Sequence, residues 1–190
     1  MLELVFVIVV IGILAAAIIP RVDRDTLYEA TEQLQSHIKY TQHLAMMDDV
    51  YDDSVEHWFY EYWKIDFPGA NHQYVISKGD SGGNFHAHTT IARDPQTRRN
   101  IDGTANDEYD LNDKYSVTVG MTDGTTANGV LAFDHLGRPH YLANNTNPLR
   151  PVSNLLKANL VITITDVNDA TNTATITVAP ETGYSFTTFN

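Results

Sequence analysis

The stretch MLELVFVIVVIGILAAAII, residues 1–19, is an almost unbroken apolar run that carries a single charge, Glu3. As an α-helix rising about 1.5 Å per residue, it would be roughly 28 Å long, enough to cross the hydrocarbon core of a bilayer. A carboxylate at the centre of such a helix costs about 2.5 to 3.5 kcal/mol on insertion scales, so it usually has a partner. No basic residue precedes Arg21. We therefore expect Glu3 to pair with a positive group on another copy of the chain, the alternative being a solvated end residue.

The string from Glu3 to Pro20, ELVFVIVVIGILAAAIIP, resembles the N-terminal segment of type IV pilins and type II secretion pseudopilins. Members of that superfamily are cut by a prepilin peptidase behind a short basic leader, and the new N-terminal phenylalanine is N-methylated. The alignment starts two residues past the mature N-terminus, so the leader and those two residues have no counterpart in the sequence.

The resemblance implies a homo-oligomeric helical filament, built by a pilus assembly machinery, with a core of staggered N-terminal helices. In such filaments the glutamate matched by Glu3 neutralises the N-terminal amine of a neighbouring subunit. Gly12 and Pro20 match the two positions between which the helix is often stretched or melted after assembly. Glu3, Gly12 and Pro20 are therefore the expected assembly residues.

The first 48 residues are expected to form one long helix in two halves. Residues 1–20 would be its apolar transmembrane or filament-core half, with a kink near Pro20 because proline removes a helical hydrogen bond. Residues 21–48 would be its amphipathic half, since apolar residues recur there at helical spacing. The face that they form comprises Leu27, Ala30, Leu34, Ile38, Thr41, Leu44 and Ala45. Four acids lie between residues 48 and 53. Carboxylates are unfavourable at the C-terminal, negative end of a helix dipole, so the helix should end at about residue 48.

Residues 49–190, which we call the head, have the pattern of an antiparallel β-structure. Alternating or β-branched runs, separated by Gly, Asn, Asp and Pro, predict strands. The runs are residues 62–67, 73–77, 115–120, 129–134, 160–166 and 173–179. Residues 167–172 predict a hairpin turn between the last two, and residues 77–114 are expected to form a long loop region. The expected fold is α+β, with the long N-terminal helix packed on a C-terminal antiparallel sheet.

The chain is acidic and has no cysteine. It has 24 acidic and 12 basic residues among 190 and a formal net charge of −12. Polyanions should be repelled on average, and nucleic acid is disfavoured as a partner, although Arg93, Arg98 and Arg99 form one basic cluster that could touch phosphates. Without cysteine there is no disulfide, but this absence does not fix the cellular compartment.

Two further strings, FDHLGRP at 133–139 and VAPETGY at 178–184, resemble segments near the C-terminus of H-type minor pseudopilins and their pilus relatives. The simpler interpretation is ordinary turn chemistry. Gly137 and Gly183 would supply permissive backbone dihedrals, and Arg138 would anchor a loop through hydrogen bonds.

The chain has a few histidines and acidic residues that could bind a metal. His86 and His88 could lie on one face of a strand, but zinc needs further ligands, and His135 and His140 flank a turn. Two acidic loops offer the oxygen ligands that calcium prefers, although neither fits an EF-hand and solvated turn residues are the simpler interpretation. Their candidate ligands are Asp107, Asp110, Asp113, Asp166, Asn168 and Asp169. No nucleophile elbow, P-loop or dinucleotide fingerprint is present, so we expect no enzymatic activity and no obligatory cofactor.

The sequence thus predicts a structural subunit of a type IV pilus-like filament, held in the inner membrane as a single-pass protein and then assembled into a cell-surface pilus. One alternative is a minor pseudopilin of a type II secretion or DNA-uptake pseudopilus, and another is a membrane-tethered binding module. The sequence leaves open whether the subunit is major or minor, whether the filament serves adhesion, motility, secretion or DNA uptake, and whether the chain is glycosylated or binds metal.

Overall fold

The longest described helix is α2 (Thr26–Met47), which packs on residues 49–190, so from here on the head means residues 25–190. A computed structural model describes residues 3, 5–11, 25–68, 72–122, 129–143 and 149–190. Asp25 caps the start of α2, because its side chain accepts a hydrogen bond from the backbone N of Tyr28 at 3.0 Å. At the other end Asp48 accepts a bond from the indole nitrogen of Trp63 at 2.9 Å and pairs with Lys78. The predicted end of the helix near residue 48 is therefore confirmed, and Asp48 also ties it to the sheet.

The expectation of one long helix, apolar and then amphipathic, is wrong. The only long helix among the described residues is α2, which starts at a capped N-terminus rather than continuing an earlier segment. The physical reason is the Asp25 cap, which satisfies a free N–H group of a first turn. Residues 5–11 are also helical, while residues 12–24 lie outside the described residues. No described helix has both the length and the apolar character needed to cross a bilayer.

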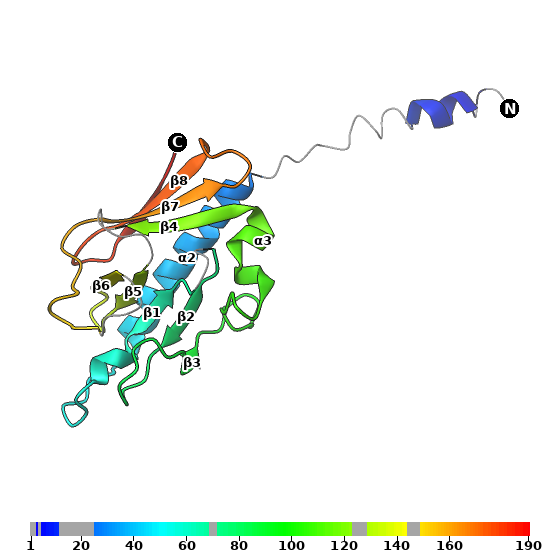
Figure 1. The fold of residues 1–190 in the computed structure, drawn as a ribbon. Coiled ribbons are helices and arrows are strands. Elements are labelled where there is room, and N and C mark those ends of the chain that lie inside the picture. Colours follow the sequence, from blue (N-terminus) through cyan, green and yellow to red (C-terminus); the bar gives the residue numbers. More distant parts are fainter. Residues whose placement is uncertain (1–2, 4, 12–24, 69–71, 123–128, 144–148) are drawn as a thin grey trace.

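In the part of the chain that the structure describes, nine strands form two antiparallel sheets, whose arrangement around α2 can be followed in Figure 1. The five-stranded sheet has the order β3 (Thr90–Ile91), β2 (Val75–Lys78), β1 (Trp63–Asp66), β5 (Gly129–Phe133) and β6 (Pro139–Ala143). The four-stranded sheet has the order β4 (Val117–Thr122), β7 (Leu160–Asp166), β8 (Thr173–Val178) and β9 (Ser185–Phe189). The expectation of a single sheet is therefore also wrong.

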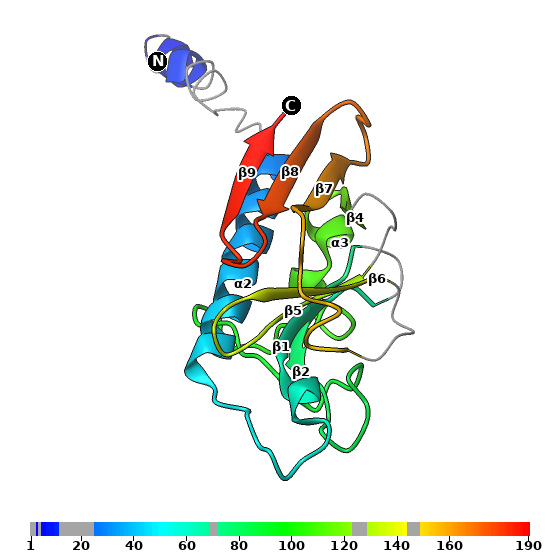
Figure 2. The same ribbon diagram turned by 90° about the vertical axis from the view of Figure 1, so that its left-hand side faces the viewer.

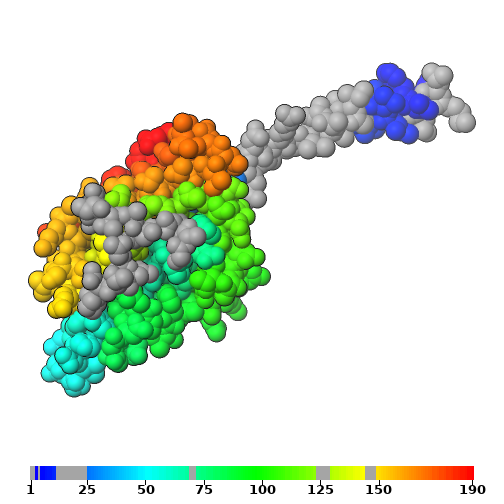
Figure 3. Space-filling model, viewed as in Figure 1, coloured from blue at the N-terminus to red at the C-terminus, as the bar shows by residue number. Residues whose placement is uncertain are grey.

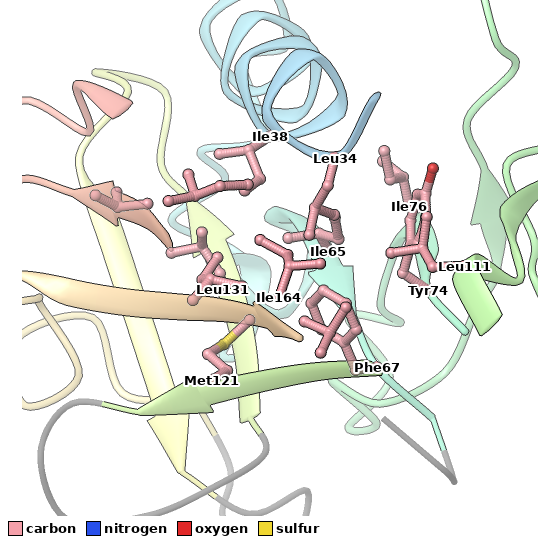
Figure 4. Close-up of a cluster of buried hydrophobic side chains, with 14 of the residues drawn as sticks. Leu34, Ile38, Ile65, Phe67, Tyr74, Ile76, Leu111, Met121, Leu131 and Ile164 are labelled. Carbon is pink, nitrogen blue, oxygen red and sulfur yellow. The ribbon is translucent and has the colours of Figure 1, made fainter. Parts of the chain in front are cut away.

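The core lies where α2 meets both sheets. Figure 4 shows Leu34 and Ile38 of α2 pointing toward Ile65 of β1, Leu131 of β5 and Ile164 of β7. All five side chains are fully buried. Each contributes about 1.5 to 3 kcal/mol relative to an exposed position, so this apolar face holds α2 against the two sheets.

Six of the nine strands fall where the sequence pattern predicts them, and the predicted hairpin between β7 and β8 is confirmed. Strands β3, β6 and β9 were not predicted. The predicted loop region at 77–114 also contains β3, the 3-10 helix η2 (Asp107–Tyr109) and most of the short helix α3 (Leu111–Tyr115). A further short helix, η1 (Trp58–Glu61), lies outside that region and precedes β1. Because Ile101, Tyr109 and Leu111 are buried, this region contributes to the core as well as to the surface.

Candidate functional site

The expected assembly residues lie mostly at the edge of the described structure. Glu3 is helical and exposed. Six apolar side chains between Val5 and Ile11 are 52–68% exposed, so they have no packing partner within the described residues. Gly12 and Pro20 lie outside the described residues. The described part of this segment therefore presents one carboxylate and an apolar surface that the other described residues leave exposed.

The two C-terminal strings meet at one side chain of α2. The Nε2 group of Gln42 donates hydrogen bonds to the carbonyl oxygens of Gly137 and Thr182, both at 2.8 Å. Gly137 has φ +76° and Gly183 has φ +65°, a region that strongly favours glycine. A Cβ on Gly183 would lie 2.5 Å from Nε2 of Gln42 and 2.8 Å from the Gly137 oxygen. The two turns are thus joined to each other and to the helix.

A buried carboxylate, Asp134, organises the first of these turns. Its Oδ1 accepts bonds from the backbone N–H groups of Leu136 and Arg138, and its Oδ2 accepts one from Nε of Arg138 at 2.7 Å. The predicted anchoring role of Arg138 is confirmed. Burial raises the pKa of Asp134, but bonds from His140 and Arg138 outweigh it and lower the pKa to about 2. The carboxylate therefore stays ionised and holds the turn closed.

A polar pocket of about 520 Å³ lies between α2 and the segments 94–97 and 108–115. Its lining combines carboxylates, tyrosines and His37. Gln33 connects its parts, because Nε2 of Gln33 donates to the hydroxyl of Tyr74 at 2.8 Å while its Oε1 accepts bonds from Lys114 and Tyr115, both at 2.8 Å. Sequence reasoning did not find this pocket, because the residues concerned are polar positions of an ordinary amphipathic helix.

His37 is a buried titratable group of this pocket. Its Nδ1 lies 2.6 Å from the hydroxyl of Tyr74. Gln33 donates to that hydroxyl, and in the tautomer that carries its proton on Nε2 the Nδ1 atom of His37 accepts the phenol proton of Tyr74. Burial lowers the pKa of His37 to about 4, opposed by the negative charge of Asp94. The side chain is therefore uncharged at neutral pH.

The expected histidine pair does not lie on a strand, because His86 and His88 belong to the irregular segment before β3. Nδ1 of His88 is 2.7 Å from the hydroxyl of Ser77, and its Nε2 is 3.8 Å from Oδ2 of Asp66. Ser77 is fully buried, so its hydroxyl is not accessible to a substrate in this conformation. Lys64, directly across the strand pair from Ser77, has its pKa lowered to about 8 by burial.

The candidate calcium ligands take part in local capping. Asp110 is buried and accepts bonds from the backbone N–H groups of Asn112 and Asp113 and from His72 and Gln73. Burial raises the pKa of Asp110, but these bonds outweigh it and the net shift is downward.

The other four carboxylate candidates form no joint cluster with Asp110. Asp107 and Asp113 lie in the first turns of η2 and α3. In the hairpin between β7 and β8, Asp166 accepts a bond from the backbone N of Asn168, and Asp169 accepts bonds from Thr171. Across the described ranges of the chain, no three His, Asp or Glu side chains are grouped so as to hold a metal ion. Calcium binding stays a prediction.

Comparisons with protein-family models, with curated proteins and with solved structures each found no match for this chain.

Proposed function

We propose that the chain is a structural subunit of a type IV pilus-like filament, assembled from an inner-membrane pool through its N-terminal apolar segment. The observation that carries the proposal is Glu3 followed by a run of exposed apolar side chains at residues 5–11. The sequence of the chain from Glu3 to Pro20 also resembles the N-terminal segment of type IV pilins. We do not propose an enzymatic role, and the filament would reach the cell surface after assembly.

The proposed mechanism is packing between copies. The apolar residues of the segment leave lipid for an equally apolar bundle, so the hydrophobic gain is small and close packing at small residues such as Ala15, Ala16 and Ala17 must contribute. Within that bundle a desolvated Glu3 requires a positive partner, because an unpaired buried charge costs about 3 to 5 kcal/mol. Glu3 would therefore set the register in which neighbouring subunits pack.

The substitution Glu3→Ala tests this mechanism. We expect it to lower the yield of filaments by about tenfold or more, since it removes an interaction stronger than the 1.4 kcal/mol that a tenfold change represents. Filaments sheared from cells that make the variant would be counted by electron microscopy, and the head would be checked by circular dichroism. Glu56→Ala is the matched control, because Glu56 is an exposed acid of the head. Normal filaments from the Glu3→Ala chain would refute the assigned role.

A second candidate function is a minor pseudopilin of a type II secretion or DNA-uptake pseudopilus. It is favoured by the two C-terminal strings, whose turns are joined at Gln42. The two candidates differ in one measurable property. A major subunit polymerises when it is the only pilin present, whereas a minor subunit needs another pilin to form a filament. Expression of this chain alone, followed by electron microscopy, separates them.

A further inference from the structure

Strand β9 forms one edge of the four-stranded sheet and has a neighbour, β8, on one side only. The backbone N of Ala179 donates to the oxygen of Tyr184, and the N of Asn190 donates to the oxygen of Thr173. Both bonds belong to the β8–β9 register, so the even-numbered residues of β9 bond to β8. The N–H and C=O groups of residues 185, 187 and 189 therefore point away from β8.

This outer edge is largely unpaired. Among these groups, within the described residues, only the carbonyl of Ser185 accepts a hydrogen bond, from Nε2 of Gln35 at 3.1 Å. Thr187 and Phe189 each offer one donor and one acceptor at the edge. An open edge is a template for another strand, and proteins usually block it with charge, proline or a covering segment. The sequence of β9, SFTTF, contains neither charge nor proline.

Other strand edges in the described structure are protected. Residues 154–156 cover β6, since the backbone N of Tyr141 donates to the oxygen of Asn154 and the N of Leu156 donates to the oxygen of Pro139. Strand β3 has two residues, and β4 packs beside α3. The edge of β9 is longer than β3, and although α2 packs beside it, the outward backbone groups of Thr187 and Phe189 have no hydrogen-bond partner within the described residues.

Four aromatic side chains surround this edge, and we call them the aromatic edge: Tyr28, Tyr184, Phe186 and Phe189. They are 41–64% exposed. They form two stacked pairs, Tyr28 with Phe189 at 5.3 Å between ring centroids and Tyr184 with Phe186 at 6.1 Å. Clustered exposed aromatic rings beside unpaired backbone groups are typical of a protein interaction site.

We propose that the aromatic edge is the surface through which the head contacts a second copy of this chain. This inference rests on the proposed function, because it names the head contact of the same filament. Tyr28 lies in the first turn of α2, three residues after the Asp25 cap, so the aromatic edge begins where the N-terminal segment ends. Figures 1 and 3 show the C-terminal strands at the end of the head where α2 begins, and Figure 2 shows β9 beside α2.

Position and charge both favour a second copy as the occupant. If the apolar segments of several copies pack side by side, their neighbouring heads are held near this end of α2. Each copy carries a formal net charge of −12, so two heads repel one another wherever acidic surfaces meet. Residues 182–190, TGYSFTTFN, contain no acidic or basic side chain. The C-terminal part of the aromatic edge therefore adds no like-charge contact when two copies approach, and the acids near it are Asp25 and Glu29 beside Tyr28.

The test uses the absence of cysteine from the chain. A Phe186→Cys variant of the full-length chain is labelled with a benzophenone maleimide, brought to assembly by dilution from detergent and irradiated. The matched control is Val152→Cys, which places the same probe on an 85% exposed side chain. We expect at least tenfold more crosslinking between copies from position 186 than from position 152, and mass spectrometry would identify the receiving surface. Adding Tyr184→Asp, at a side chain exposed to solvent, should abolish most of this crosslinking without unfolding the head.

The outcomes separate this inference from the proposed function. If filaments form and position 186 crosslinks no more than position 152, the inference is overturned while the filament proposal stands. If no filament forms but position 186 still crosslinks copies preferentially and Tyr184→Asp prevents it, the inference stands and the filament proposal fails. Preferential crosslinking to an unrelated protein in the same preparation, without crosslinks between copies, also overturns the inference.

Discussion

At the residue scale, His37 links the polar pocket to the stability of the fold. Its pKa is lowered to about 4 in the folded chain by burial, against 6.5 for an ordinary histidine. Above pH 6.5 the imidazole is neutral in both states. Between pH 6.5 and 4 the unfolded chain binds a proton that the folded chain does not, so stability falls as the pH falls; below pH 4 both states are protonated.

We therefore expect acidification from pH 7 to pH 4 to remove about 3 kcal/mol of unfolding free energy through His37. In the variant His37→Gln this contribution should be absent, because an amide does not titrate while its oxygen can still accept the Tyr74 proton. Urea unfolding at both pH values measures the difference. His43→Gln, at an exposed position of the same helix, is the control and should keep the pH dependence. An equal pH dependence in His37→Gln and the natural chain would contradict the assignment.

At the element scale, the end of α2 is held to both sheets by the joint of Gln42 with the turns at Gly137 and Gly183. One turn follows β5 and the other precedes β9, so the joint connects strands of different sheets to one helix. Any other residue at position 183 would have to adopt the left-handed backbone conformation of Gly183. Its Cβ would also lie too close to the Gln42 amide and the Gly137 carbonyl. The joint thus depends on glycine for two independent reasons.

The substitution Gly183→Ala should destabilise the head by about 1 to 3 kcal/mol, since the left-handed backbone alone costs about 1 to 2 kcal/mol. Thermal unfolding followed by circular dichroism would measure the loss. Gly120→Ala is the matched control, because a Cβ on that strand residue would meet nothing within 4 Å, and its effect should stay within about 1 kcal/mol. Equal effects of the two substitutions would show that the joint is not strained.

Elements with a regular hydrophobic period were predictable, and those defined by backbone capping were not. The face of α2 and strands such as β7 and β8 follow simple patterns of 3.6 or 2 residues. Strand β9 is short, starts after a turn and has one buried residue, Ser185, so its sequence shows no alternation of apolar residues. The polar pocket was missed for a related reason, because its residues come from α2 and from segments about 60 to 80 positions away whose contact only the fold creates.

At the scale of the whole molecule, the chain consists of a head with a core of its own and an N-terminal segment with exposed apolar side chains. Every buried hydrophobic residue of the described structure lies at Leu27 or beyond. The described part of residues 1–24 contributes an exposed carboxylate and an exposed apolar surface. The stability of the fold therefore depends on the head, whereas the proposed assembly also needs the N-terminal segment, so removal of that segment should leave the fold intact.

A chain shortened to residues 25–190 should consequently fold and remain monomeric in aqueous buffer. Its midpoint of thermal unfolding should differ from that of the full chain by no more than about 2 °C, a shift that corresponds to less than 1 kcal/mol for a domain of this size. Asp25 is kept because its side chain caps the first turn of α2, and a matched chain carrying Asp25→Ala should lose about 1 kcal/mol of unfolding free energy.

The full chain, by contrast, should need detergent or self-associate, because six large apolar side chains of residues 5–11 are exposed in a single copy. Sedimentation velocity distinguishes the two chains. Unfolding of the shortened chain would mean that the N-terminal segment contributes to the core of the head. Self-association equal to that of the full chain would mean that the head contact alone is enough for assembly.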